Sequence, residues 1–407
     1  MFKTRASLGL LALASVFGAC VSQTGSTSDV EERTSALGGF DGGAPGGTTG
    51  AGGCPAGLGG APVLATGIRG FTRNNTHYAV VHELNTSSII QVSGAPFKNP
   101  ITVASDALSG SAPWGYVRSD GLAAVLYVDA QRHVHEIAAS SNLDLFAAAG
   151  INAPAAAPAE ASGFVPDVIG YVRSDNKSAI IYRSATNHVI ELKSNFGGMG
   201  QPAWLVTDLT AASGASVTVG KGSAFPFVRS DSFNSIVYVG SDNRIHAMSM
   251  LDAILVDEDM STISGDTGTP ASEPIGVRRP DGYNSILFVD TQSQVHQLAS
   301  LFGGAWGKSI LAYGATSQRP AAYTRPDGTN VVVYASVLRE IVELRLANGQ
   351  WLSTVLPTGC VKPLGPLFGH TSPPSRNSVL FYGASGTTVG RYELFRSGGS
   401  PWTLSTF

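Results

Sequence analysis

The stretch YVRSDNKSAIIYRSATNHVIEL, residues 171–192, holds the spacing that decides the fold. Arg173 is followed nine residues later by Tyr182, and Tyr182 is followed nine residues later by Glu191. A fixed spacing inside a repeat of about 40–50 residues is typical of β-propellers and of helical solenoids. The same spacing recurs in five further copies: Arg73/His82/Gln91, Arg118/Tyr127/Glu136, Arg229/Tyr238/Ala247, Arg279/Phe288/Gln297 and Arg325/Tyr334/Glu343.

Each copy is β in character, which favours the propeller. Short runs of apolar, mostly β-branched residues end at the aromatic position, as at 179–182 and 331–334, and a turn dipeptide precedes each run. Such runs bounded by turn residues predict strands. A further segment with a tryptophan follows in most copies, and a seventh, degenerate copy keeps Tyr382 and Glu393. The sequence therefore predicts an all-β fold, a seven-bladed β-propeller of four-stranded antiparallel blades, over residues 62–407.

Residues 1–19 have the composition of an export signal. Lys3 and Arg5 precede a short apolar segment, and small residues lead to Cys20. A cysteine at this place resembles the lipobox of bacterial lipoproteins, which implies lipidation of Cys20; an ordinary signal peptide that happens to precede a cysteine is the alternative. Residues 20–61 are rich in Gly, Ser and Thr and predict a flexible tether. We expect a bacterial cell-envelope protein, an outer-membrane lipoprotein or a secreted one, that contacts the membrane only through its N-terminal lipid.

The cysteines predict one cross-link. With Cys20 assigned to lipid, Cys54 and Cys360 remain as an even pair in an oxidising compartment. A closed ring brings the start of the first blade near the last blade, so we expect a disulfide between Cys54 and Cys360. Two free thiols are the alternative.

Composition and motifs argue against several classes of function. A net charge of −3 with 14% charged residues and no cluster of Lys or Arg gives no basic surface for nucleic acid. The histidines fall at equivalent places in the repeats and form no pair with metal-ligand spacing, so neither a metal nor a cofactor is expected. No Gly-x-Ser-x-Gly elbow occurs. The repeated glutamates are spread around the ring instead of converging as in a glycosidase, and no catalytic residue is predicted.

The repeated arginines and glutamates are candidate binding groups. A two-residue loop between the second and third strands would make each aromatic residue the direct cross-strand partner of its glutamate, on the same face of the blade. In one interpretation, Arg and Glu form a repeated buried ion pair, and the Asp two residues after each Arg is a turn residue. In the other, a guanidinium and a carboxylate clamp a sugar diol in a cleft between blades. Gln91, Ala247 and Gln297 show that the fold tolerates loss of the charge, which favours a binding role.

Three blades keep the whole set of residues and are predicted to bind carbohydrate. The predicted contacts in the second, third and sixth blades are Arg118, Tyr127 and Glu136; Arg173, Tyr182 and Glu191; and Arg325, Tyr334 and Glu343. Trp204, Trp306 and Trp351 are candidate platforms for stacking a sugar, and burial between blades is their alternative role.

The repeats resemble the blades of propeller lectins related to the fucose-specific lectins of fungi and bacteria. The resemblance rests on segments such as 171–175, 180–182 and 189–192 with Trp204, and covers about residues 65–407. It implies a non-catalytic protein that holds a sugar between neighbouring blades by Arg, Glu and Trp or Tyr, and so glycans or polysaccharides as partners. A propeller scaffold for protein partners and a propeller glycoside hydrolase are the alternatives.

The match to the lectin motif is residue by residue and incomplete. Glu136, Glu191 and Glu343 match the family's glutamate, and Trp204, Trp306 and Trp351 match its tryptophan segment. The family carries its arginine on the strand just before the aromatic residue, where this chain has apolar residues such as Ile180 and Ile236.

Overall fold

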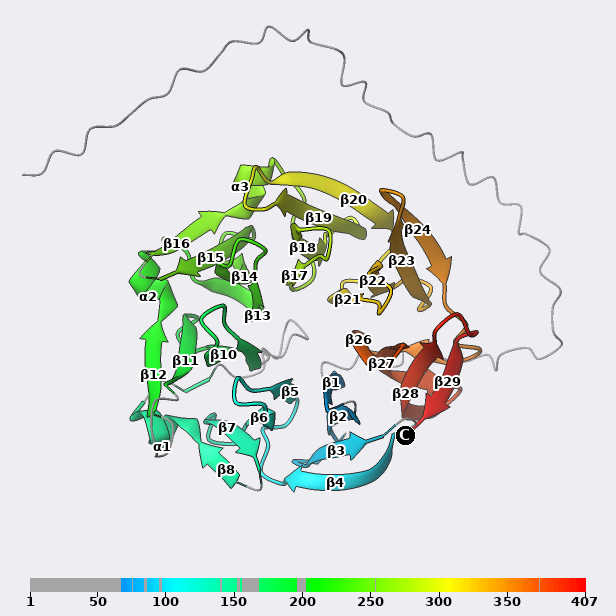
Figure 1. Cartoon of the computed structure of the whole chain (residues 1–407), viewed down its shortest axis with the longest axis horizontal. Coiled ribbons are helices and arrows are strands. Elements are labelled where there is room, and N and C mark those ends of the chain that lie inside the picture. The colour runs from blue at the N-terminus through cyan, green and yellow to red at the C-terminus, as the bar shows by residue number, and fades with distance from the viewer. Residues whose placement is uncertain are drawn as a thin grey trace, which may run out of the picture. The chain divides into compact units, whose positions relative to one another are not determined.

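Seven antiparallel sheets stand in a ring around a central axis, as the computed structural model of the chain shows (Figure 1). The structure describes residues 67–74, 76–83, 86–94, 97–139, 141–151, 154–155, 168–195, 203–252, 254–372 and 374–407. The prediction of a seven-bladed, almost all-β propeller is confirmed. The predicted signal segment 1–19 and tether 20–61 lie outside the described residues.

The first four blades each consist of four strands that are consecutive in the sequence. Blade 1 contains β1 (Arg69–Arg73), β2 (Thr76–His82), β3 (Ile89–Ser93) and β4 (Lys98–Ala104). Blade 2 contains β5 (Trp114–Val117), β6 (Ala123–Val128), β7 (Val134–Ala138) and β8 (Ser141–Asp144). Blade 3 contains β9 (Ile169–Val172), β10 (Ser178–Arg183), β11 (Val189–Asn195) and β12 (Ala203–Asp208). Blade 4 contains β13 (Val219–Val228), β14 (Asn234–Gly240), β15 (Ile245–Leu251) and β16 (Ile254–Asp259).

The last three blades follow the same order, except that blade 7 has one additional short strand. Blade 5 contains β17 (Ile275–Arg278), β18 (Tyr283–Val289), β19 (Gln294–Leu301) and β20 (Gly307–Tyr313). Blade 6 contains β21 (Ala321–Thr324), β22 (Asn330–Ala335), β23 (Ile341–Ala347) and β24 (Gln350–Val355). Blade 7 contains β25 (Lys362–Pro363), β26 (Phe368–Ser372), β27 (Arg376–Ser385), β28 (Thr388–Ser397) and β29 (Thr403–Thr406).

Three short helices follow the outer strands of blades 2, 3 and 4: α1 (Leu145–Ala149), α2 (Leu209–Ser213) and α3 (Met260–Ser264). Each is capped by an Asp side chain at its start, because that carboxylate accepts hydrogen bonds from the first backbone amides. Each ends at a glycine in the left-handed conformation. No described helix is long and apolar enough to cross a membrane.

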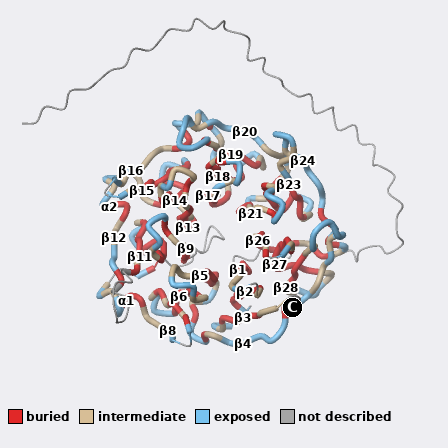
Figure 2. Tube along the Cα trace, viewed as in Figure 1, coloured by how far each residue is buried: buried red, intermediate tan, exposed pale blue. Residues whose placement is uncertain are grey.

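The core lies between neighbouring blades. The second strand of each blade is almost entirely buried, as in β10 and β14, whereas the outer strands β4, β20 and β24 are largely exposed (Figure 2). Tyr116 and Leu126 of blade 2, for example, pack against Ile180 and Tyr182 of blade 3. Each blade therefore depends on its neighbours for burial, as in other repeat proteins.

Close packing between blades requires glycine at several of the innermost strands, as at Gly170 and Gly276. A Cβ atom at Gly170 of blade 3 would lie 2.6 Å from the ring of Tyr116 in blade 2. A Cβ atom at Gly276 of blade 5 would lie 2.0 Å from the ring of Phe227 in blade 4. An aromatic ring of one blade thus lies directly on the backbone of the next.

The hairpin between the second and third strands differs from the prediction. In blade 3 the amide of Ser184 donates to the carbonyl of His188, so the three residues 185–187 form the loop, and Asn187 is left-handed with φ 65°. This extra residue shifts the pairing by one position, so Glu191 opposes Ile181 instead of Tyr182. The predicted direct pairing of the aromatic residue with the glutamate is therefore wrong, and the two side chains lie on opposite faces.

Side-chain contacts between blades 7 and 1 close the ring. His77 Nδ1 lies 3.2 Å from His370 Nε2, and the hydroxyl of Tyr382 donates to the carbonyl of His82 at 2.6 Å. Cys360, before blade 7, is disulfide-bonded. Cys54 lies outside the described residues, so the Cys54–Cys360 pairing stays a prediction.

Candidate functional site

The repeated arginine and glutamate meet in blades 2, 3 and 6, on the face of the blade that packs against the next one. In blade 3, Arg173 Nη1 lies 2.6 Å from Glu191 Oε1, and Arg173 Nε lies 3.2 Å from Asp175 Oδ1. The hydroxyl of Tyr171 donates to Glu191 Oε1 at 3.3 Å. Glu191 is only 2% exposed. The carboxylate is thus enclosed and already accepts hydrogen bonds from two side chains of its own blade.

Blade 2 repeats this arrangement. Tyr116 donates to Glu136 Oε1 at 2.6 Å, and Arg118 Nη1 donates to Glu136 Oε2 at 2.7 Å. Burial raises the pKa of Glu136, and the hydrogen bond from Tyr116 and the charge of Arg118 offset part of that increase. Burial and the adjacent carboxylate raise the pKa of Tyr116 well above its usual range, so the phenol remains a donor.

Blade 6 has the same network. The hydroxyl of Tyr323 donates to Glu343 Oε2 at 3.4 Å, and Arg325 forms an ion pair with Glu343. The tyrosine in each network stands two residues before the arginine and is not among the contacts predicted from the sequence. A period of two along the first strand places both side chains on one face, so the Tyr-x-Arg spacing was a usable signal.

The predicted aromatic residues take no part in these networks. Tyr127, Tyr182 and Tyr334 are buried on the opposite face of their blades. Tyr127 stacks on His135 with ring centroids 5.0 Å apart, and Asn142 donates to its hydroxyl at 2.9 Å. These tyrosines therefore belong to the packing between blades.

Two tryptophans, Trp306 and Trp351, approach the repeated arginine of the blade before their own. The guanidinium of Arg229 in blade 4 lies 5.7 Å from the ring of Trp306 in blade 5. Arg279 of blade 5 lies 5.9 Å from the ring of Trp351 in blade 6. Trp204 is 4% exposed and packs in the core between blades 2 and 3.

The cleft between blades 5 and 6 is open, with a cavity of about 310 Å³. Val277 stands where blade 3 has Tyr171, and Gln297 stands where blade 3 has Glu191. A valine carries neither the ring nor the hydroxyl that fills the corresponding space in blades 2, 3 and 6. The cavity is lined mainly from blades 5 and 6, with Phe227 and Val228 of blade 4 at one side. The residues from blades 5 and 6 are Gly276, Val277, Arg278, Arg279, Ser285, Leu287, Gln297, Ala322, Tyr323, Thr324, Asn330, Val331, Val332 and Trp351.

The polar groups of this cavity are held in place by their neighbours. Gln297 Nε2 donates to Ser285 Oγ at 2.8 Å, and Ser309 Oγ donates to Gln297 Oε1 at 3.4 Å. Arg279 Nε donates to Asp281 Oδ1 at 3.0 Å. The guanidinium of Arg279 also lies 4.7 Å from the ring of Tyr283, in addition to its contact with Trp351. The cavity thus combines a fixed cation, an amide and an apolar wall.

The cleft between blades 4 and 5 has lost the glutamate and is filled in another way. Ala247 stands at the glutamate position, and Phe227 takes the tyrosine position and packs on Gly276. Arg229 Nη2 pairs with Asp231 Oδ2 at 2.6 Å. Loss of the glutamate alone therefore does not open a cleft.

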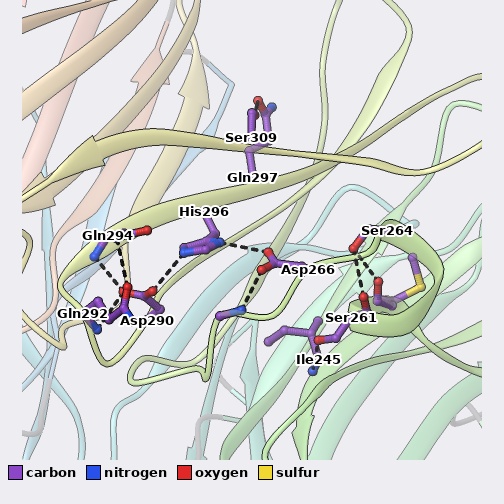
Figure 3. Close-up of polar contacts among 12 residues, drawn as sticks. Ile245, Ser261, Ser264, Asp266, Asp290, Gln292, Gln294, His296, Gln297 and Ser309 are labelled. Carbon is purple, nitrogen blue, oxygen red and sulfur yellow. Dashed lines mark hydrogen bonds and ion pairs between the residues drawn. The ribbon is translucent and has the colours of Figure 1, made fainter. Parts of the chain in front are cut away.

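A second group of polar residues lies at the hairpin loops of blade 5. His296 Nδ1 lies 2.9 Å from Asp266 Oδ2, and His296 Nε2 lies 3.0 Å from Asp290 Oδ2 (Figure 3). Burial opposes the charged imidazole, but the hydrogen bonds to the two carboxylates outweigh burial and raise the pKa of His296. Figure 3 shows His296 and Gln297 pointing to opposite sides of β19. Asp266 lies between α3 and blade 5, so His296 fastens this connection to the blade.

The described residues hold no group of three or more His, Cys, Asp or Glu side chains that could bind a metal ion. A cavity of about 530 Å³ lies beside His296, and one of about 510 Å³ lies beside Arg244. Neither cavity, nor the one between blades 5 and 6, is lined by the glutamates of blades 2, 3 and 6.

Solved structures of propeller lectins are similar to this chain. A lectin from Burkholderia pseudomallei has 10% identity and a TM-score of 0.60, and the match covers 84% of this chain and 98% of that chain. A fungal lectin from Aleuria aurantia, a six-bladed β-propeller that recognises fucose, has 11% identity, a TM-score of 0.44 and coverage of 83% and 93%. No family model and no curated protein matches the sequence. The resemblance to propeller lectins is confirmed at the level of the fold.

Proposed function

We propose that this protein is a non-catalytic carbohydrate-binding propeller and that the cleft between blades 5 and 6 is a binding site. The observation that carries the proposal is the cavity of about 310 Å³ between Arg279, Gln297 and Trp351. Small-molecule sites are concave, measure about 300–1,000 Å³, and place a few polar groups in a mostly apolar lining. The fold shared with the lectin from Burkholderia pseudomallei supports the same function.

The lining suits a sugar, which has apolar C–H faces and polar hydroxyl edges. Val277, Leu287 and Val332 provide an apolar wall. Gln297 offers both a donor and an acceptor, and Trp351 offers an aromatic surface at the border of the cavity. A sugar ring placed between these groups would bury its C–H faces and keep its hydroxyls hydrogen-bonded.

The complete Arg/Glu sets of blades 2, 3 and 6 have a different role in this proposal. Their glutamates are enclosed, and Tyr116, Tyr171 and Tyr323 occupy the position that a sugar hydroxyl would take. We assign these sets to the scaffold, where each tyrosine acts as a built-in substitute for a ligand.

We also propose that the protein is exported and anchored to the cell envelope by lipid on Cys20. The composition of residues 1–19 supports export, and the disulfide at Cys360 is typical of an oxidising compartment. Labelling of cells with a radioactive fatty acid tests the anchor. Label in the wild-type protein and its absence from the Cys20→Ser variant is the expected result.

A glycan array tests the binding site. Purified protein should bind a defined set of glycans, and the Val277→Tyr variant should lose them, because a phenol then fills the cavity as in blade 3. The matched control is Phe71→Tyr, which adds a hydroxyl at the equivalent position of blade 1 and should leave binding unchanged. Binding that survives in Val277→Tyr, or no binding by the wild-type protein, would refute the proposal.

A further inference from the structure

The geometry points to an acidic saccharide, one with a carboxylate beside its sugar ring, as the ligand of the cleft between blades 5 and 6. This inference rests on the carbohydrate-binding function proposed above. Blade 5 departs from blade 3 at three cleft positions together, and the three changes alter space and charge in ways that favour the same kind of ligand.

The first change makes room. Val277 replaces Tyr171, which in blade 3 donates its hydroxyl to Glu191 and fills the space beside it. A cavity of about 310 Å³ lies beside Val277. Gln297 lines this cavity although it is only 4% exposed, so a ligand in the cavity would contact the edge of its amide.

The second change removes a negative charge. Gln297 replaces Glu191 at the same position of the third strand. Among the described residues that line the cavity, none is Asp or Glu. A carboxylate-bearing ligand would be repelled by a glutamate here, whereas the Gln297 amide, fixed by Ser285, has a neutral polar edge.

The third change adds a positive charge. Arg278 replaces Val172, and the equivalent positions of blades 2, 4 and 6 are Val117, Val228 and Thr324. Arg278 is exposed and points to the opposite side of β17 from Val277 and Arg279, where the cavity continues to Phe227 and Val228 of blade 4. No other cleft of the described ring combines two adjacent arginines with the loss of the glutamate.

The cleft therefore has the opposite sign of charge from its closed counterpart. Arg173, Asp175 and Glu191 give the blade 3 set one net negative charge, whereas Arg278, Arg279 and Asp281 leave blade 5 with one net positive charge. Such a reversal favours an anion in a cleft partly shielded from water.

Arg279 is well placed to receive that anion. Asp281 binds the Nε and Nη2 edge of the guanidinium, and Nη1 has no bond to another described residue. The rings of Tyr283 and Trp351 flank the guanidinium and fix its plane. A guanidinium held in this way binds a carboxylate with a small loss of side-chain entropy.

Calorimetry with matched sugars tests the inference on the purified full chain. The panel contains the methyl glycosides of glucuronic and galacturonic acid, the uncharged methyl esters of the same uronides, the neutral hexosides, a sulfated galactoside, and acetate alone. We expect at least one uronide to bind at least tenfold more tightly than its methyl ester and its neutral hexoside. Acetate alone should bind too weakly to detect, because it lacks the sugar ring.

Two variants copy the blade 3 residues into blade 5. Arg278→Val and Gln297→Glu should each reduce the preference for the uronide over its ester to about threefold or less. Arg345→Val is the matched control, because it removes an exposed arginine from a strand of blade 6 outside this cavity, and it should keep the preference. Circular dichroism of each variant checks that the fold is retained.

Three outcomes would overturn the inference, and they bear differently on the proposed function. If neutral hexosides bind as tightly as uronides and Val277→Tyr abolishes both, the cleft binds sugar but the acidic class is wrong. If the sulfated galactoside binds more tightly than either uronide, the anion is not a carboxylate. If no saccharide binds, or if Val277→Tyr leaves binding intact, the proposed function fails together with the inference.

Discussion

The cleft after blade 3 and the cleft after blade 5 have the same strand order, yet one is filled and the other is open. After blade 3, Tyr171 and Arg173 both bind Glu191, and the phenol occupies the space beside that carboxylate. After blade 5, Val277 and Gln297 leave a cavity beside Arg279. In the function we propose, the most regular repeats serve the scaffold, and the copy that departs from the pattern forms the binding site. Substitutions at equivalent positions of the two blades test this contrast.

Removal of the buried carboxylate should have the largest effect. Glu191→Ala leaves the guanidinium of Arg173 buried without its main partner, so we expect a loss of about 3–5 kcal/mol in the free energy of unfolding. Gln297→Ala in the open cleft removes only a neutral amide and should cost about 1–2 kcal/mol. Denaturant unfolding of both variants gives the comparison, and equal losses would contradict a structural role for the blade 3 set.

The tyrosine hydroxyl should come next. Tyr171→Phe keeps the ring but removes a donor to Glu191, and hydrogen bonds to charged groups contribute about 1.5–3 kcal/mol. Val277→Phe in blade 5 needs Ala322→Gly beside it, because blade 6 has Ala322 where the other blades have the glycine on which such a ring packs. The double variant adds a ring where space exists and should leave the free energy of unfolding unchanged or raise it. Thermal unfolding distinguishes the two. A stable Tyr171→Phe protein with an unchanged midpoint would show that the phenol only fills space.

Packing between the innermost strands should have a somewhat smaller effect on the free energy of unfolding. Gly170→Ala places a methyl group 2.6 Å from the ring of Tyr116 and should cost about 1–3 kcal/mol through overpacking. The same substitution in a Tyr116→Val background should cost less, because the smaller side chain leaves space for the added methyl group. A double-mutant cycle measures this coupling. Additive losses would show that the ring and the glycine do not constrain each other.

The pH dependence of stability should show the smallest effect. The pKa of His296 is raised, so its contribution is complete below about pH 6.5, the ordinary value, and is lost as pH rises through the folded-state pKa. The pKa of Asp266 is lowered, because hydrogen bonds from His296 and Gly268 outweigh burial, so its contribution is lost only in acid. His296→Gln should therefore destabilise the protein more at pH 6 than at pH 9. Denaturant unfolding at the two pH values measures the difference, and a larger loss at pH 9 would contradict the assignment.

The histidine pair between blades 7 and 1 should have the opposite pH dependence from His296, because it should destabilise the folded protein as the pH falls. Burial lowers the pKa of His370 to about 3 and that of His77 to about 4, so the unfolded chain takes up protons before the folded one as pH falls below about 6.5. His370→Gln should reduce the loss of stability between pH 6.5 and 4.5, and unfolding midpoints measured across this range check it. An unchanged acid profile would exclude this histidine pair as a cause.

The sequence predicts the number of blades because the separation in sequence between Arg173 and Glu191 recurs in the other copies, and each copy corresponds to one blade. The sequence does not predict which residues of the second and third strands pair, because the left-handed Asn187 adds one residue to the loop between them. Arginine, which rarely adopts this conformation, takes the same place at Arg132 and Arg339, so the residue type does not reveal the longer loop. The substitutions Val277 and Gln297 are visible in the sequence. That they open a cavity follows only from seeing Tyr171 fill the same place in a closed cleft.

The consecutive order of strands within each blade has a consequence for how such a ring changes over time. Because blades 1 to 6 each use four neighbouring strands, one uninterrupted segment of a gene encodes a whole blade. Tandem duplication of that segment therefore adds one complete blade, instead of parts of two neighbouring blades. Copies that keep the Tyr, Arg and Glu network maintain the ring, so another copy is free to diverge and acquire a new recognition chemistry.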